Sequence, residues 1–294
     1  MNSSATIEDP ATDEARTVSS GAAACATLRL LSYNVQVGIS TSRPHHYITR
    51  SWKHLLPHPQ RLTNLDRIAE TISQYDIVGV QELDAGSLRS GFLNLTDYLA
   101  TRAGFPFWHH QVNRRIGNIA QNSHGLLSRA VPHDVQEYRL PGLIPGRGAI
   151  VARYGDPDNP LAVFLLHLAL SPRARQSQLD FLADLIREHR HVVLMGDFNC
   201  QPHSREMARL FRTTDLCEPE SVLHTFPSWK PDKHIDHILI TPSLRVVSAQ
   251  VLQDAWSDHL PIAMEIGLPD GMVVTPSVPG RPWGSEGERG HGSG

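Results

Sequence analysis

The sequence has few of the features that mark secreted, membrane-spanning or disulfide-bonded proteins. Its 294 residues include three cysteines, Cys25, Cys200 and Cys217, and this odd number without paired spacing indicates neither a disulfide framework nor a zinc site. No stretch approaches the ~20 apolar residues of a membrane span. The first residues lack the basic start and apolar run of a signal peptide. We therefore expect a soluble, cytoplasmic protein without a transmembrane segment.

A strong excess of basic residues is also missing. The formal net charge is −3, and the acidic terminal segments account for it, which leaves the middle of the chain near neutral. Proteins that bind DNA regardless of sequence usually carry a marked basic excess. The charge therefore favours a small phosphorylated substrate, with nucleic acid as the alternative partner, and nothing in the sequence indicates an oligomeric state.

Polar, aperiodic segments at both ends flank the part of the chain that we expect to fold. Residues 1–26 are rich in small polar side chains and residues 269–294 in proline, glycine and serine, and both compositions are typical of disorder. The overall hydrophobic content of 40% is that of a globular protein. We expect one folded domain over residues 27–268.

Short apolar runs with the length and β-branched content of strands dominate this domain. They lie at residues 28–39, 76–83, 149–154, 161–170, 191–199, 235–241, 244–252 and 261–268. Residues 61–75, 93–104 and 173–189 instead repeat apolar side chains at helical spacing. Strands outnumber helices and do not alternate with them regularly. This pattern predicts an α+β protein with two sheets packed face to face and helices outside.

Ionisable and amide side chains gather at the ends of these predicted strands. They are Asn34, Glu82, His167, Asp197, Asn199, Asp236, Asp258 and His259. One histidine in an apolar strand is commonly a satisfied core residue, and one aspartate after a strand is commonly a turn former. Burying many such groups costs several kcal/mol unless they pair or bind a metal. Their number in one domain therefore indicates an active site.

The residue types suit the hydrolysis of a phosphate ester. Glu82, Asn34 and Asp258 offer the hard oxygen ligands that Mg²⁺ or Mn²⁺ prefers. Asp197 can orient or deprotonate an attacking water, assisted by the amide of Asn199. Because no cysteine, serine or threonine lies in a nucleophile motif, direct attack by water with metal assistance is the predicted mechanism.

Two histidines and one further aspartate complete this set. His167 and His259 can donate hydrogen bonds to phosphate oxygens in the transition state. Asp236 can fix the tautomer of His259 and raise its pKa.

The ordered motifs SYNVQVG, VQELD, LLHLAL, MGDFNCQP, HIDHILIT and WSDHLPIAMEI resemble the endonuclease/exonuclease/phosphatase superfamily. The resemblance covers residues 27–268 and implies a DNase I-like four-layer α/β/β/α sandwich of two mixed β-sheets, with the site at one edge of the sheets. By position, the resemblance also implies that Asn34 and Glu82 bind the metal and that His167 contacts phosphate. It implies that Asp197 and Asn199 activate the water and that Asp236 supports His259. Asp258 and His259 match the family's last motif.

One position departs from the pattern of the repair nucleases of that superfamily. They carry an aspartate two residues after the asparagine of the first strand, and here the residue is Gln36. A carboxamide supplies less charge, so a second metal of that kind is not expected. The segment HTFPSWKPDKH resembles the small-molecule and lipid phosphoesterases more than the repair enzymes. A nuclease is the alternative function, and a catalytically silent scaffold is a third.

Basic residues at two places are candidates for substrate binding. Residues 36–61 contain no acidic residue, and we expect Arg43, Arg50 and Lys53 to form part of a substrate-binding lid, with an ordinary surface connection as the alternative. Arg173 and Arg175 lie at a predicted helix start, where they contact either phosphate or solvent.

Overall fold

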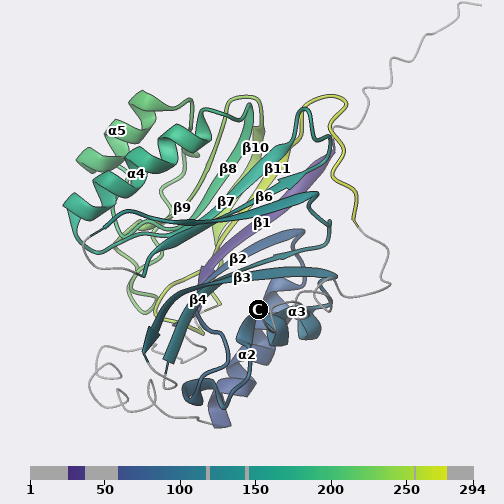
Figure 1. Ribbon diagram of the computed structural model, residues 1–294, viewed down its shortest axis with the longest axis vertical. Helices are drawn as coiled ribbons and strands as arrows, with labels where there is room; N and C mark the ends of the chain where they lie inside the picture. The colour runs from purple at the N-terminus through teal and green to yellow at the C-terminus, as the bar shows by residue number, and fades with distance from the viewer. Residues whose placement is uncertain (1–25, 37–58, 117–119, 143–145, 255, 277–294) are drawn as a thin grey trace, which may run out of the picture.

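Two β-sheets packed face to face, each covered on its outer face by helices, make up the protein (Figure 1). This computed structural model describes residues 26–36, 59–116, 120–142, 146–254 and 256–276. The four-layer α/β/β/α sandwich expected from the sequence is thereby confirmed. Residues 1–25 and 277–294 of the predicted tails, and residues 37–58 of the predicted lid, lie outside the described part.

The first sheet has six strands in the order β10-β11-β1-β2-β4-β3. Their bounds are Thr27–Asn34 for β1, Ile77–Asp84 for β2, Phe107–Ile116 for β3, Ala120–Ser128 for β4, Arg245–Val251 for β10 and Ile262–Gly267 for β11. β1 and β2 run parallel, and the other neighbours run antiparallel. The sheet is therefore mixed.

The second sheet has five strands in the order β5-β6-β7-β8-β9. Their bounds are Asp134–Arg139 for β5, Gly148–Tyr154 for β6, Leu161–His167 for β7, His191–Asp197 for β8 and Asp236–Ile240 for β9. β7 and β8 run parallel and are buried throughout, which explains why both read as continuous apolar runs.

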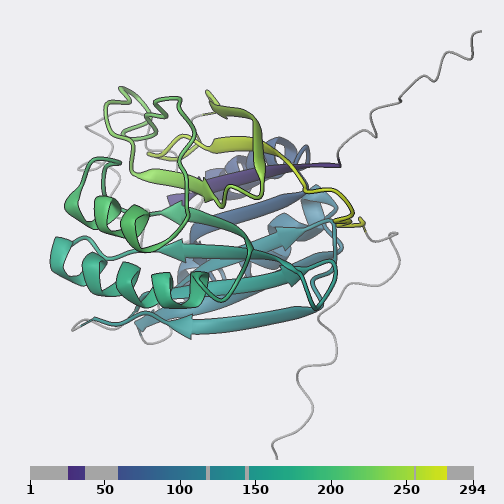
Figure 2. The ribbon, with the colours of Figure 1, turned by 90° about the horizontal axis from the view of Figure 1, so that it is seen from above.

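Helices α2 and α3 cover the first sheet, and α4 and α5 cover the second (Figures 1 and 2). Their bounds are Pro59–Ile72 for α2, Leu95–Ala103 for α3, Pro172–Ile186 for α4 and Arg205–Thr213 for α5, with a short 3₁₀ helix at Leu88–Ser90. Asn94, Ser171 and Ser204 cap α3, α4 and α5 by accepting hydrogen bonds from backbone N–H groups of the first turn.

The core consists of an apolar layer between the sheets and one under each pair of helices. Alternation along a strand assigns side chains to these layers: Leu165 and Met195 lie between the sheets, whereas Leu166 and Leu194 face α4 and α5. Gly79 of β2 faces the second sheet, and a Cβ there would lie 2.4 Å from Leu165 Cδ1. Because Gly79 has no side chain, the two sheets can pack closely against each other at this position.

Several elements differ from the sequence prediction. Strands β3, β4 and β5 and helix α5 were not predicted from the sequence. For β3 and β5 the reason is that they lie at sheet edges and mix polar with apolar side chains. At the C-terminal end, the boundary at residue 268 needs correction. Val274 is buried and Met272 packs against the layer between the sheets, so residues 269–276 are not a disordered tail.

Candidate active site

Three polar side chains lie side by side on adjacent strands of the second sheet. His167 of β7 lies opposite Asp197 of β8, and Asp197 lies opposite Asp236 of β9. Residues paired in register point to the same face of a sheet. That face is turned towards the first sheet, because Met195 and Ile238, two positions away, belong to the layer between the sheets. The register thus brings together three residues that lie far apart in the sequence.

The first sheet contributes Asn34, the last residue of β1, and Glu82 of the parallel strand β2. Asn34 Nδ2 donates to Glu82 Oε1 and to Asp197 Oδ2, each at 3.1 Å. The Asn34 amide therefore joins both sheets at the site. In this orientation its nitrogen faces the carboxylates, and its Oδ1 accepts from the backbone N–H of Gln36 at 3.2 Å.

The backbone at the site adopts conformations that are rare for residues with side chains. Gln36, Glu82 and Asn199 have φ values of 44°, 58° and 54°, in the left-handed region. Glu82 also lies where the register between β2 and β4 shifts, between Val80 and Leu83. Such strain and such bulges concentrate at functional sites because they redirect a side chain.

Asp236 and His259 form a buried ion pair. His259 Nδ1 donates to Asp236 Oδ2 at 2.8 Å, and Thr225 Oγ1 donates to the same oxygen. Burial alone would lower the pKa of His259, but the charge and hydrogen bond of Asp236, together with the charge of Asp197, raise it to about 10. His259 is therefore an imidazolium at neutral pH.

His167 has the opposite charge state although it lies in the same site. Its Nε2 is 3.4 Å from Asp197 Oδ2 and 3.9 Å from Glu82 Oε1. Burial, followed by the positive charge of Arg147, lowers the pKa of His167 well below its usual value. His167 is thus a neutral imidazole, and His259 is the cation.

Asp197 is held by several hydrogen-bond donors. The backbone N–H of Asn199 donates to Asp197 Oδ1 at 2.9 Å. The side chain of Asn199 donates to the carbonyl of Leu168 at 3.1 Å, which fixes the turn after β8. Gly196, directly before Asp197 in β8, has a φ of 145°, and a Cβ there would lie 2.0 Å from the carbonyl oxygen of Leu166, so this position excludes a side chain.

Buried carboxylates are crowded together in the site. Burial and the charge of Asp236 raise the pKa of Asp197 to about 7, and burial and the charge of Asp258 raise the pKa of Glu82. Asp258 is itself buried and accepts a hydrogen bond from Ser257 Oγ at 3.1 Å. Raised pKa values show that the negative charge is incompletely compensated by the protein. A hard divalent cation fits such a set of oxygen donors.

Two sets of ligand atoms in the candidate active site are compact enough for one ion. Glu82, His167 and Asp197 form one set, and Asp197, Asp236 and His259 form the other, with ligand atoms within 4.8 Å of one another in each. Asp236 Oδ1 is buried and has no hydrogen-bond partner among the described residues. Because His259 is protonated and paired with Asp236, the set around Glu82 suits a cation better.

Arg147 is a site residue that the sequence analysis missed. It lies directly before β6. Its charge opposes the rise in the pKa of Glu82 and contributes to the fall in the pKa of His167, while the charge of Asp197 acts on Arg147 in return. Arg147 therefore belongs to the electrostatic surroundings of the carboxylates. The sequence signal was an arginine between two glycines, at Gly146 and Gly148, immediately before an apolar strand.

The predicted substrate-binding residues have different outcomes. Arg43, Arg50 and Lys53 lie outside the described residues. Arg173 is exposed in the first turn of α4. Arg175 is buried, donates to Glu206 Oε1 from Nη2 at 2.8 Å and contacts the carbonyl of Leu170. These contacts give Arg175 a structural role, and its contact with phosphate stays a prediction.

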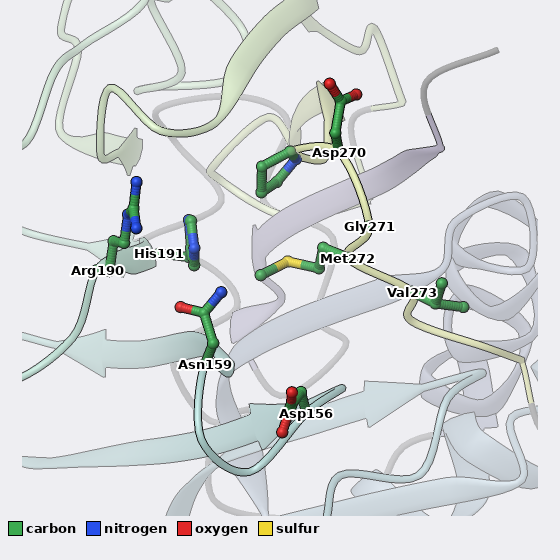
Figure 3. A pocket seen from close by; sticks show the side chains of 9 residues that line it. Asp156, Asn159, Arg190, His191, Asp270, Gly271, Met272 and Val273 are labelled. Carbon is green, nitrogen blue, oxygen red and sulfur yellow. The ribbon is translucent and has the colours of Figure 1, made fainter. Parts of the chain in front are cut away.

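A hollow of about 280 Å³ lies at the other end of the second sheet, away from these residues (Figure 3). Asn159 and His191 line it, at the points where β7 and β8 begin, whereas His167 and Asp197 end these strands. A seven-residue strand spans roughly 20 Å. The hollow is therefore separate from the candidate active site.

The family of the chain follows from its sequence. The model of the Endonuclease/Exonuclease/phosphatase family matches residues 31–259. The chain belongs to this family, whose members are metal-dependent phosphoesterases or nucleases. A comparison with curated proteins finds no match.

Solved structures of this family share the fold. An endonuclease/exonuclease/phosphatase from Beutenbergia cavernae has a TM-score of 0.64 and 19% identity, with 83% of this chain and 72% of that chain covered. A mannosyl-6-phosphatase from Bacteroides thetaiotaomicron has a TM-score of 0.60 and 17% identity, with coverage of 81% and 99%. D. rerio TDP2 complexed with a single-strand DNA product has a TM-score of 0.59 and 17% identity, with coverage of 82% and 99%. At these identities the likeness extends to the fold alone.

Among the described residues, none of the helices is both long and apolar enough to cross a membrane.

Proposed function

We propose that the protein hydrolyses the phosphate ester of a small molecule, a sugar or a lipid, by attack of water, with Mg²⁺ or Mn²⁺ as the cofactor. The observation that carries the proposal is the convergence of Asn34, Glu82, His167, Asp197, Asp236 and His259 at one edge of the two sheets. Glu82 is the member of the compact set that we propose as a metal ligand, together with Asp258, whose charge acts on Glu82, and with Asn34, which contacts Glu82. When bound, the cation supplies positive charge that polarises the phosphoryl group.

The protonation states assign complementary roles to the other residues. Asp197, with a pKa of about 7, is suited to accept a proton from the attacking water near neutral pH. The imidazolium of His259 donates a hydrogen bond to a phosphate oxygen and offsets negative charge as it develops. Asp236 keeps His259 charged and oriented. His167, as a neutral imidazole, donates to a phosphate oxygen without a net charge, and Arg147 adds a second fixed cation.

Two observations bear on the substrate class. The near-neutral charge of the body favours a small ester over a long nucleic acid. The mannosyl-6-phosphatase among the structural neighbours fits this choice, whereas the TDP2 complex with DNA keeps a nuclease as the second candidate. We place the enzyme in the cytoplasm on the sequence features described above.

A hydrolysis panel tests the proposal. Plasmid DNA, RNA, phospholipids, inositol phosphates and sugar phosphates are incubated with Mg²⁺ or Mn²⁺, and Asp197→Ala serves as the inactive control. Turnover of a small or lipid ester that Asp197→Ala abolishes supports the proposal. Turnover restricted to DNA or RNA, together with DNA binding that weakens steeply as salt rises, favours the nuclease. Absence of turnover across the whole panel argues for a silent scaffold.

A further inference from the structure

A second group of metal-ligating side chains lies on the opposite face of β9 from the active site. Asp236 and His237 are neighbours in this strand, and consecutive side chains point to opposite faces. Asp236 faces the first sheet with Ile238, and His237 faces α4 and α5 with Leu239. His237 is fully buried, and Glu218 and His234 lie beside it.

The three side chains converge on one point. Glu218 Oε1 lies 2.8 Å from His237 Nδ1 and 3.4 Å from His234 Nε2, and all three ligand atoms lie within 4.8 Å of one another. The two imidazole rings stack with centroids 4.4 Å apart. Glu218 belongs to the connection between α5 and β9, and His234 lies two residues before the first residue of β9. The cluster thus ties a long connection to the sheet.

The contact of His237 Nε2 with the backbone directs its other ring nitrogen, Nδ1, to the centre of this cluster. His237 Nε2 lies 2.9 Å from the backbone carbonyl of Cys200, which can only accept, so Nε2 carries a proton. Nδ1, the other ring nitrogen, lies 2.8 Å from Glu218 Oε1, which is also an acceptor, so either a proton or a metal ion must lie between the two atoms. A metal-binding histidine characteristically donates its other ring N–H to a backbone carbonyl or a carboxylate. A cation between Nδ1 and Oε1 satisfies both acceptors.

A neutral imidazole and a carboxylate are the forms of these side chains that bind metals. His234 and Glu218 supply one of each beside His237, and the side chain of His234 is buried.

From this geometry we infer that Glu218, His234 and His237 bind a transition-metal ion of the Zn²⁺ class, at a site separate from that of the phosphoesterase metal. Two imidazoles and one carboxylate form a ligand set typical of Zn²⁺, and nitrogen ligands select against Mg²⁺. Tetrahedral ligands at ~2.0–2.1 Å from zinc lie roughly 3.3 Å apart. The 3.4 Å separation matches this value, and the 2.8 Å separation must widen by roughly 0.5 Å.

The position of the site gives the ion a structural role. The carbonyl that His237 contacts belongs to Cys200, in the turn that carries Asp197 and Asn199. Phe198 of the same turn packs edge-on against the His237 ring, with centroids 4.8 Å apart. The bound ion therefore stabilises the turn after β8 from the side opposite the active site, and it also holds the connection before β9 in place.

Zn²⁺ titration of the metal-free full-length chain in excess Mg²⁺ tests the inference. We expect tight binding of one Zn²⁺ per chain in the wild type, in Glu82→Gln and in His133→Ala, which removes an exposed histidine elsewhere. Glu218→Gln and His234→Ala should bind at least ~10²-fold more weakly, because loss of even an outer hydrogen-bond partner costs roughly 10- to 100-fold. Zn²⁺ should raise the Tm of the wild type and of Glu82→Gln but not of the two cluster variants.

Circular dichroism of the metal-free proteins keeps the result interpretable if a cluster variant is unstable. The spectrum and the Tm of metal-free Glu218→Gln are compared with those of the metal-free wild type, and we expect the two proteins to match. Zinc binding that Glu82→Gln abolishes would assign the ion to the active site and overturn the inference. An unchanged zinc affinity in both cluster variants would also overturn it, as would the absence of zinc binding in the presence of excess Mg²⁺. Glu218 and His237 would then form an ordinary ion pair.

Discussion

Asp197 and Asp236 lie opposite each other on the antiparallel strands β8 and β9, yet only Asp236 has a charged partner, His259, within hydrogen-bonding distance. Asp197 instead contacts an amide, a backbone N–H and a neutral histidine. Burial and the charge of Asp236 therefore raise the pKa of Asp197 to about 7. Two neighbouring carboxylates thus acquire different proposed tasks, proton acceptance for Asp197 and support of a cation for Asp236.

Removal of divalent cations should abolish hydrolysis. The proposed ligands Glu82 and Asp258 are hard oxygen donors, so EDTA should eliminate turnover and Mg²⁺ or Mn²⁺ should restore it. Zn²⁺ should not be required for the chemical step. Because EDTA also removes zinc, Glu218→Gln is the matched control, and Mg²⁺ should restore its activity as well. Full turnover in metal-free buffer would exclude the mechanism.

Replacement of Asp197 separates chemistry from folding. Asp197→Asn keeps the shape of the side chain but removes the group proposed to accept a proton. We expect kcat to fall by at least ~10²-fold with little change in KM. Thermal unfolding of the same sample checks that the fold is intact. Near wild-type turnover of a stable Asp197→Asn variant would show that the assigned role is wrong.

Asp236 and His259 should act as one unit. If Asp236 only charges and orients His259, the losses in kcat from His259→Ala and Asp236→Ala should not add. The double variant should be about as slow as the slower single variant. Steady-state kinetics of all four proteins form the cycle, and losses that add in log kcat would mean that the two residues have independent roles.

The buried ion pair between Arg175 and Glu206 should contribute to stability rather than to substrate binding. Arg175→Met leaves Glu206 buried without its charged partner, which costs about 3–5 kcal/mol of unfolding free energy. The double variant Arg175→Met/Glu206→Met should recover much of this loss. Denaturant unfolding measures both. A rise in KM without loss of stability would instead support phosphate contact by Arg175.

His124 should make the protein sensitive to acid. Burial, followed by nearby positive charges, lowers its pKa in the folded state to about 3, whereas an unfolded histidine has a pKa of ~6.5. The stability associated with the neutral ring is therefore fully present above pH ~6.5 and is lost as the pH falls towards 3, by up to about 1.4 kcal/mol per pH unit.

The measurement is the unfolding free energy of His124→Gln between pH 7 and pH 4. We expect a flatter pH dependence than in the wild type, because the variant has no proton to take up on unfolding. His133→Gln, which changes an exposed histidine, is the matched control and should follow the wild type. Parallel curves for wild type and His124→Gln would contradict the prediction.

The sequence by itself determined the layers and indicated most of the residues proposed for the candidate site. Strands β7 and β8 are buried on both faces, so their unbroken apolar runs could be recognised without a structure. The polar residues that end them, His167 and Asp197, stood out for the same reason. Edge strands such as β5 carry no such signal, because half of their side chains meet solvent.

Only the tertiary structure decided which polar residues meet. The charge of Arg147 acts on Glu82 of the site, whereas Arg175, equally basic in the sequence, is hydrogen-bonded to Glu206. Glu218 and His237 come together through the pairing of β8 with β9 and the course of the connection before it. Strand register and the alternation of side chains between two faces set these contacts. Register and alternation bring together residues that lie far apart in the sequence, so the spacing of residues along the chain does not reveal these contacts.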